Sequence, residues 1–444
     1  MERIFLYKSY NTTVSYDDKN WYVNEISQAE EGACSIDELR TQAQDKAYSL
    51  MKESVITYCS NFRNLAILTA AGTSMENGEN GGKTRTELWA SYKDDIIEIR
   101  NIIAESNAGA AAKCDEIIES KNIENFLSFV ILYEKINGKI KDKKGNFLIE
   151  SVEKKIADAC RLELDSKNSH HASFLQKITS RKMGLPRVQL YTTNYDTLFE
   201  QAAQRLNYTI IDGFSFSYPR VFNGSNFDKD IVYRKHTRVK QEDSFVPGVF
   251  QLFKLHGSID WEKSSDGRIL QKEHVERPCI IYPASEKYES SYEQPYFEMM
   301  ANLQHTLREE GTFLIIAGFG FQDKHIQNII REATSQNHNF HLLIVCYGQH
   351  PTAESSSASD DLTQKNNDVI GKEGSLKEKD TSLEKKESLW IDGIVGSLVP
   401  GYLDDKGATI PNVTIIYSKF KDFVENYPLN DSYLTQSETI TTPL

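Results

Sequence analysis

The sequence predicts an α/β fold: a doubly wound, Rossmann-like parallel sheet with a helical insertion and an N-terminal arm. Two observations predict it. Short apolar runs that end in polar or glycine-containing segments recur along the chain, and segments with helical periodicity alternate with them. Strands that alternate with helices imply a parallel sheet with helices on both faces. At 444 residues, 39% of them hydrophobic, the chain is also long enough for a large core.

The N-terminal part begins with residues 1–34, which mix aromatic and polar residues and predict short strands or an extended arm. The segment SIDE, Ser35 to Glu38, has capping-box spacing and predicts a helix through residues 37–59. Next, LAIL at 65–68 is a buried strand that turns tightly at AAGTS into a helix. We therefore assign residues 1–60 to an arm and helix.

Residues 61–425 form the expected main domain, and residues 426–444 form a C-terminal tail. Ile96, Ile99 and Ile103 recur at helical spacing, so residues 92–160 are predicted to be a helical insertion. Further strands end at VQLYTTNYD, FQLFKLHGS, TFLIIAGFG, FHLLIVCYG and NVTIIYSKF. The helices between and after them are TLFEQAAQRL, DKHIQNIIREAT and KDFVENY.

Residues 351–388 contain no aromatic residue and almost no apolar ones. Such a segment cannot bury enough surface to offset its ordering entropy, so we expect a disordered insertion. It separates the last two predicted strands and should leave the sheet as a loop.

Composition excludes several classes of protein. The net charge of −13 argues against a mainly electrostatic nucleic-acid binder. The six cysteines are scattered without a CxxC pair, which disfavours a zinc ribbon and a disulfide framework. No apolar run approaches the ~20 residues that span a bilayer, and the N-terminus lacks a signal-peptide pattern. We therefore expect a cytoplasmic protein without a membrane partner.

Four predicted strands end in polar or glycine-containing segments. They are AAGTS at 70–74, TTNYD at 192–196, LHGS at 255–258 and GFGFQD at 318–323. In open parallel sheets, ligands bind outside the carboxyl ends of the strands. The sequence therefore predicts that these four segments line one crevice, although each segment alone is a weak signal.

The first two segments each allow a structural alternative. In AAGTS, small side chains let backbone amides approach a phosphate, and Thr73 and Ser74 could donate hydroxyl hydrogen bonds. An ordinary tight turn is an equally good interpretation of AAGTS alone. In TTNYD, Asn194 both donates and accepts, which suits a ribose hydroxyl or a water. Asp196 has the strong alternative of capping the following helix.

The histidines differ in what they predict. His256 follows a strand and precedes Gly-Ser, so it should lie at the mouth of the crevice and suits general-base work. A lone histidine is more often structural. His325 is expected within a helix, in a structural role. His170 and His171 are expected in a polar loop without a ligand set, so no metal is assigned.

Together, the four segments resemble the sirtuin family. The family's phosphate loop, GAGxSxxSG, stands here as AAGTSMENG at residues 70–78, and its TQNID and HGS segments stand as TTNYD and LHGS. Two features depart from sirtuin deacylases: the zinc-binding CxxC pairs are absent, and ENGGKTRTELW replaces the PDFR segment. The chain looks closer to the sirtuin-like NADases of bacterial antiphage defence, which share TTNYD, LHGS, a GFGFxDxH-like segment and IExFLS, here IENFLS at 123–128.

This resemblance implies an NAD hydrolase that cleaves the nicotinamide–ribose bond, with NAD as substrate and no metal. It implies that Asn194 positions ribose or water and that His256 takes a proton. It also implies a cofactor-binding set in which the turn would hold the diphosphate, Asp196 would lie near the nicotinamide carboxamide, and Gly318 with Phe319 would approach the adenine end. The full set is Ala71, Gly72, Thr73, Ser74, Thr193, Asp196, Gly318 and Phe319.

Two other functions remain open: a module that senses NAD or ADP-ribose without turnover, and an NAD-dependent protein deacylase. Because unrestrained NAD hydrolysis would be lethal to the cell, we expect conditional activity in a homo-oligomer, such as a ring. The defence resemblance adds a HerA-type ATPase or a phage-derived trigger as an expected partner.

Overall fold

We describe the fold from a computed structural model of the chain. The structure describes residues 3–28, 35–83, 85–121, 123–142, 144–182, 184–233, 245–275, 277–280, 294–347, 395–396, 398–399 and 412–428. The predicted insertion at 351–388 and most of the predicted tail at 426–444 lie outside the described residues.

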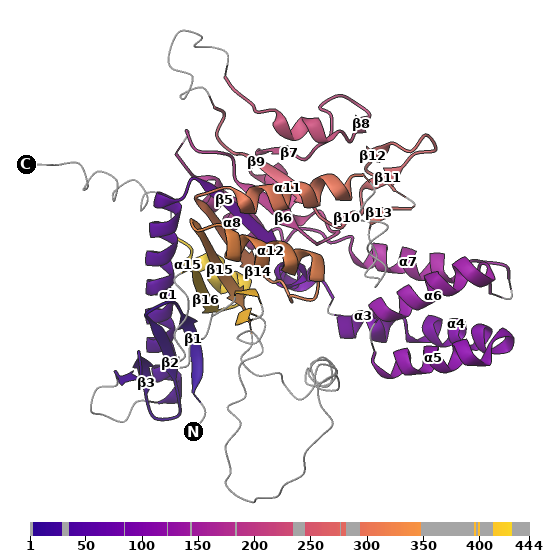
Figure 1. The fold of residues 1–444 in the computed structure, drawn as a ribbon, viewed down its shortest axis with the longest axis horizontal. Helices are drawn as coiled ribbons and strands as arrows, with labels where there is room; N and C mark the ends of the chain where they lie inside the picture. The colour runs from indigo at the N-terminus through magenta and orange to yellow at the C-terminus, as the bar shows by residue number, and fades with distance from the viewer. Residues whose placement is uncertain are drawn as a thin grey trace, which may run out of the picture.

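A parallel sheet forms the centre of the molecule (Figure 1). Its strand order is β16 (Val413–Tyr417), β15 (Phe340–Cys346), β14 (Thr312–Ala317), β5 (Asn64–Thr69), β6 (Gln189–Thr192), β9 (Val249–Lys254) and β7 (Thr209–Ile211). From β5 the chain adds β6 and β9 on one side, and later β14, β15 and β16 on the other. The order therefore reverses between β5 and β14, which is the switch point at which doubly wound folds bind ligands.

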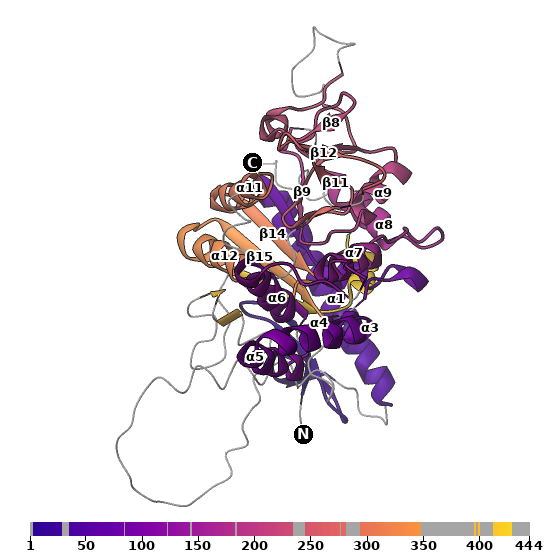
Figure 2. The same cartoon turned by 90° about the vertical axis from the view of Figure 1, so that its right-hand side faces the viewer.

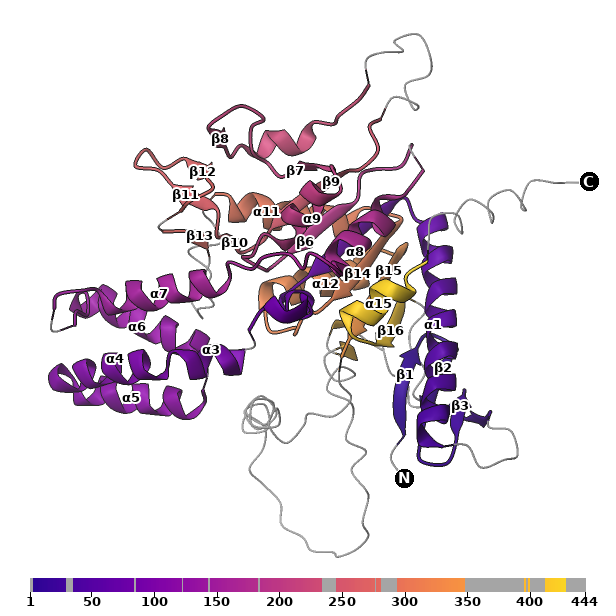
Figure 3. The same ribbon diagram turned by 180° about the vertical axis from the view of Figure 1, so that it is seen from behind.

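Helices cover both faces of this sheet. Along β5, Ala66 and Leu68 belong to one buried cluster, whereas Leu65 and Ile67 belong to the other. This alternation explains why the strand is apolar throughout, because successive side chains point to opposite faces. The first face carries α11 (Tyr296–Arg308) and α12 (Lys324–Gln336). The second face, seen from behind in Figure 3, carries α1 (Ile36–Asn61), α8 (His170–Thr179), α9 (Leu198–Arg205) and α15 (Phe420–Asn426). The predicted α/β fold class is confirmed.

The N-terminal segment extends the same sheet. It forms β1 (Ile4–Lys8), β2 (Thr13–Tyr16), β3 (Trp21–Val23) and β4 (Ile26–Ser27) in antiparallel order, and β1 pairs antiparallel with β16. The segment predicted as an arm therefore contributes strands to the sheet. The predicted helix follows, with the reciprocal capping box of Ser35 and Glu38 in place.

The predicted helical insertion is a bundle with its own core. It consists of α3 (Arg85–Ser91), α4 (Lys93–Ser106), α5 (Ala108–Glu119), α6 (Ile123–Asn137) and α7 (Leu148–Ala159). Trp89, Ile99 and Phe126 are buried inside it and belong to a cluster distinct from the two sheet clusters. Figure 1 shows the bundle projecting from the side of the sheet, and in Figure 2 the bundle faces the viewer. The prediction that residues 92–160 are mostly helical is thus confirmed.

Small strands lie beyond the end of β9. β10 (Gly257–Ser258) pairs with β13 (Cys279–Ile280), and β11 (Trp261–Lys263) pairs with β12 (Ile269–Gln271), which also pairs with β8 (Arg220–Val221). Among the described residues, no helix is both long and apolar enough to cross a bilayer.

One expectation about histidines is wrong. His170 and His171 begin helix α8 instead of lying in a polar loop. The ring of His171 is buried against Phe199 and Phe420. The polar SKNS residues before it misled the sequence interpretation, since they supply the cap, Ser169, of a helix whose face is apolar.

Candidate functional site

The carboxyl ends of four adjacent strands lie level with one another. In the register of the sheet, Ala317 pairs with Thr69, Thr69 with Thr192, and Thr192 with Lys254. With neighbouring strands about 4.8 Å apart, the ends of β14 and β9 are roughly 14 Å apart. The four predicted segments thus leave the sheet at one level and on one edge, as the sequence predicted.

Gly72 and Gly318 bring two of these segments together at the switch point. The amide of Gly72, in the short helix α2 (Ala71–Ser74), donates to the carbonyl oxygen of Gly318 over 3.0 Å. A Cβ on Gly72 would lie 2.6 Å from the Cα of Gly318. The turn after β5 and the turn after β14 therefore touch, backbone against backbone.

Asn194 joins the segment after β6 to the turn after β5. Its side-chain amide donates to the Ser74 hydroxyl over 2.7 Å and to the Ala70 carbonyl over 3.0 Å. The Ser74 hydroxyl in turn donates to Asp196 Oδ2 over 2.6 Å. These bonds fix the half-buried Asn194 side chain, so its amide group is held in one orientation at the ends of the strands.

The predicted phosphate-loop hydroxyls point inward in this structure. Thr73 Oγ1 donates to the carbonyl of Ala70 over 2.9 Å, and both Thr73 and Ser74 are buried. Thr193 uses its backbone amide to donate to Thr69 over 3.1 Å. Contacts from this turn to a diphosphate would therefore come from its backbone and from the exposed Ala71 rather than from these hydroxyls.

Asp196 supports the start of α9, although it is not the N-cap residue that the sequence suggested. The N-cap position of α9 is Thr197, yet Asp196 Oδ1 accepts the backbone amide of Leu198 over 3.1 Å. Its other oxygen accepts from Ser74. Through these two bonds, the buried Asp196 carboxylate connects the start of α9 to the turn after β5.

Lys254, the last residue of β9, forms hydrogen bonds to the backbone of the TTNYD segment. Its side chain is only 2% exposed and pairs with Glu200 over 3.0 Å. Its ammonium group also donates to the backbone carbonyls of Tyr195 and Asp196. Burial raises the pKa of Glu200 to about 7, and the nearby Lys254 opposes that rise. A buried cation thus holds the backbone of Tyr195 and Asp196, the two residues that follow Asn194.

His256 lies in the turn after β9 and contacts the segment after β14. Its Nε2 is 3.0 Å from Asp323 Oδ2, and the two side chains are 13% and 7% exposed. Gly257 follows in the left-handed region, with φ of 84°, and a Cβ there would overlap the Cys279 carbonyl. The contact completes a set of bonds that links all four segments.

The remaining predicted residues lie in the segment after β14. Phe319 is buried and packs against Phe321, with ring centroids 5.0 Å apart. Gly320 has open space where a Cβ would lie. His325 is in the first turn of α12, as predicted.

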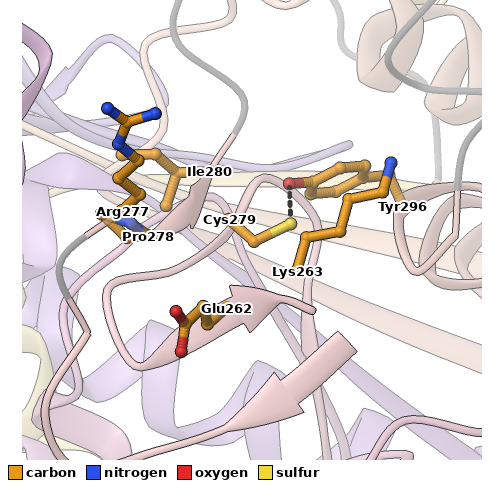
Figure 4. Close-up of a pocket in the computed structure, with 7 residues that line it drawn as sticks. All are labelled: Glu262, Lys263, Arg277, Pro278, Cys279, Ile280 and Tyr296. Carbon is orange, nitrogen blue, oxygen red and sulfur yellow. Dashed lines mark hydrogen bonds between the residues drawn. The ribbon is translucent and has the colours of Figure 1, made fainter. Parts of the chain in front are cut away.

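A cavity of about 400 Å³ lies beside strands β11 and β13 (Figure 4). It is lined by Glu262, Lys263, Arg277, Pro278, Cys279, Ile280 and Tyr296. Cys279 Sγ is 3.1 Å from the Tyr296 hydroxyl, and Cys279 pairs with Ser258 across β10 and β13. None of the site residues predicted from the sequence lines this cavity.

The arrangement can orient a polar ligand and move a proton. It offers a fixed amide at Asn194, an imidazole with a carboxylate partner at His256, and backbone at a glycine-lined switch point. Among the described residues, no group of three or more His, Cys, Asp or Glu side chains could hold a metal ion.

Sequence reasoning missed Lys254, Glu200 and Asp323 as parts of this site. A lysine inside the apolar strand FQLFKL was a signal, because a buried charge needs a partner. Asp323 stood in the GFGFQD segment, but its contact with His256 joins strands far apart in the chain, which a local pattern does not reveal.

A family model matches the part of the chain that contains three of the four segments of this site. Residues 188–370 match the family described as SIR2-like domain. The matched range contains TTNYD, LHGS and GFGFQD, and it leaves the AAGTS turn outside. No curated protein matches the chain.

Two solved structures share a limited similarity with the chain. A Sir2 homologue variant in complex with ADP-ribose is 13% identical, with a TM-score of 0.31, and covers 69% of this chain and 88% of its own. A Sir2 variant with a deacetylated p53 peptide and 3′-O-acetyl ADP-ribose is 12% identical, with the same TM-score, and covers 69% of this chain and 90% of its own. These scores are too low to relate individual residues, so the family evidence consists of the SIR2-like domain match at 188–370.

Proposed function

We propose that this protein is an NAD glycohydrolase that cleaves the nicotinamide–ribose bond. The observation that carries the proposal is the placement of Asn194 and His256 at the ends of adjacent strands, β6 and β9, beside the switch point between β5 and β14. Both residues lie within the SIR2-like match, and the four-segment resemblance to sirtuin-like NADases supports the same substrate.

The proposed reaction needs little acid catalysis from the protein. The bond between ribose C1′ and the nicotinamide nitrogen breaks, and its electron pair neutralises the pyridinium charge of the leaving group. The transition state resembles an oxocarbenium ion. A water oxygen then bonds to C1′ and loses a proton. The products are nicotinamide, ADP-ribose and that proton.

Asn194 and His256 would have separate tasks in this reaction. Asn194, fixed by Ser74 and Ala70, would orient a ribose hydroxyl or the attacking water. His256 would accept the proton from the ribose hydroxyl or the water. Asp196 near the carboxamide, the 71–74 turn with Thr193 at the diphosphate, and Gly318 with Phe319 near the adenine would hold the substrate.

One assay separates this activity from its two alternatives. Purified protein is incubated with NAD, with and without an acetylated peptide, and nicotinamide and ADP-ribose are followed by chromatography. Nicotinamide release without peptide supports the glycohydrolase. Release only with peptide, together with deacetylation, would identify a deacylase. Binding of NAD or ADP-ribose without any release in every condition would identify a sensing module.

We further propose that the enzyme is an antiphage-defence effector whose activity depends on assembly. Constant NAD hydrolysis would empty the cell of its main redox carrier, so restraint is required. The bundle offers apolar surface for subunit contacts: Leu132 and Ile136 on α6 are 41% and 75% exposed. Light scattering paired with the nicotinamide assay tests this. A monomer with full activity in the absence of a HerA-type ATPase or phage-derived trigger would contradict it.

A further inference from the structure

The contact between His256 and Asp323 bridges two strands that are not neighbours. His256 follows β9 and Asp323 follows β14, and β5 and β6 lie between these strands in the sheet. The 3.0 Å contact from Nε2 to Oδ2 therefore crosses the edge where Asn194 is placed. Both side chains are largely buried, so solvent screens the contact weakly.

The Asp323 carboxylate is held in place by helix α12. Asp323 is the N-cap residue, and its Oδ1 accepts the backbone amides of His325 over 2.9 Å and Ile326 over 3.3 Å. Helix α12 is anchored in turn by Ile326 and Ile330, which are buried in the core of the sheet. With Oδ1 committed to the cap, Oδ2 is left directed at the imidazole.

We propose that Asp323 is the positioning residue of His256, an inference that rests on the proposed function. An ionised carboxylate only accepts hydrogen bonds, so the contact selects the imidazole tautomer that carries its proton on Nε2. The lone pair of the neutral ring is then on Nδ1, which accepts the proton from the ribose hydroxyl or water. The negative charge of the Asp323 carboxylate would stabilise the imidazolium that forms.

The substitution Asp323→Ser tests this role while keeping the helix cap. Serine is a good N-cap residue, but its side chain is too short to maintain the contact with Nε2. The matched control is Asn107→Ser, which makes the same kind of change at the N-cap of α5, in the bundle. Equal thermal stability of the Asp323→Ser variant and the control would show that the cap survives.

Two measurements are made on each protein. The ¹⁵N chemical shifts of the ring, assigned to His256 by comparison with His256→Ala, report the tautomer without any need for turnover. The steady-state kinetics of nicotinamide release report kcat and KM separately. In Asp323→Ser we expect loss of the single Nε2–H tautomer and a fall in kcat, up to the roughly 100- to 10,000-fold that a general base contributes, with KM little changed.

The outcomes separate this inference from the proposed function. An unchanged tautomer in Asp323→Ser, or a changed tautomer with unchanged kcat, overturns the positioning role. An equal fall in kcat in the Asn107→Ser control would also overturn it, because the loss would then follow from helix capping alone. If the wild-type protein releases no nicotinamide, the proposed function fails, and the ¹⁵N shifts alone decide whether Asp323 sets the tautomer.

Discussion

Gly72 and Gly318 each occupy the space that a side chain on the other would need. A Cβ on Gly72 would lie 2.6 Å from Gly318 Cα, and a Cβ on Gly318 would lie 2.6 Å from the amide nitrogen of Thr73. Gly318 also has φ of 65°, in the left-handed region. The close approach of the two turns at the switch point thus requires glycine on both sides.

Gly318→Ala is therefore expected to destabilise the protein and to displace the turn after β5. The left-handed backbone costs a non-glycine residue roughly 1–3 kcal/mol, and the backbone clash adds to it. We expect a lower melting temperature, measured by calorimetry, and weaker NAD binding, measured by titration calorimetry.

Gly320→Ala is the matched control, because a Cβ at Gly320 meets nothing within 4 Å. It adds the same methyl group two residues further along the same segment. Equal melting temperatures and NAD affinities for the two variants would show that the close approach is not required.

The strands that could be predicted from the sequence are those whose side chains are apolar on both faces of the sheet. The runs at β5, β14 and β15 stand out because each is covered by helices on two sides. The short strands β8, β10 and β13 were not predictable, since each has two residues and forms only through pairing with a distant partner. The junction of β1 with β16 joins the two ends of the chain and leaves no local pattern either.

The sequence predicted which segments form the candidate site, but not the contacts between them. The strand ends identified Asn194 and His256, since polar residues directly after buried strands meet at one edge. The inward direction of the Thr73 and Ser74 hydroxyls depends on Ala70 and Asp196, which only the folded chain places beside them.

Asn194→Ala is expected to abolish nicotinamide release while the protein stays folded. The change removes the amide that would orient ribose or water, along with its bonds to Ser74 and Ala70. Ser74→Ala removes one of those bonds but keeps the amide, so it should retain part of the activity. Release is followed by chromatography, with circular dichroism as the control for folding. Wild-type turnover in Asn194→Ala would remove this residue from the mechanism.

Lys254→Met is expected to destabilise the protein by about 3–5 kcal/mol, the usual cost of removing one partner of a buried ion pair. The change leaves the half-buried Glu200 without its cation, and it removes the donor to the Tyr195 carbonyl. Adding Glu200→Gln removes the remaining charge, so the double variant should be more stable than Lys254→Met alone. Urea unfolding of the four proteins of this cycle gives the coupling. Additive effects would show that the pair is not coupled.

His171→Leu is expected to make the protein less sensitive to acid. Burial against Phe199 and Phe420 lowers the pKa of His171 from 6.5 to about 4. Because the folded pKa is below the unfolded value, the unfolded chain takes up a proton that the native protein does not as pH falls below about 6.5. Stability is therefore present in full above that pH and is lost progressively down to about pH 4.

The size of this effect follows from the two pKa values. Between pH 7 and pH 5, the wild-type protein should lose about 2 kcal/mol through this histidine alone, and His171→Leu should not. The other histidines, such as the buried His341, titrate in both proteins and cancel in the comparison. Urea unfolding at the two pH values measures the difference. Equal losses in the two proteins would mean that the native protein protonates this ring as readily as the unfolded chain does, as it would if the nearby Asp196 carboxylate, which raises the pKa of His171, outweighed the effect of burial.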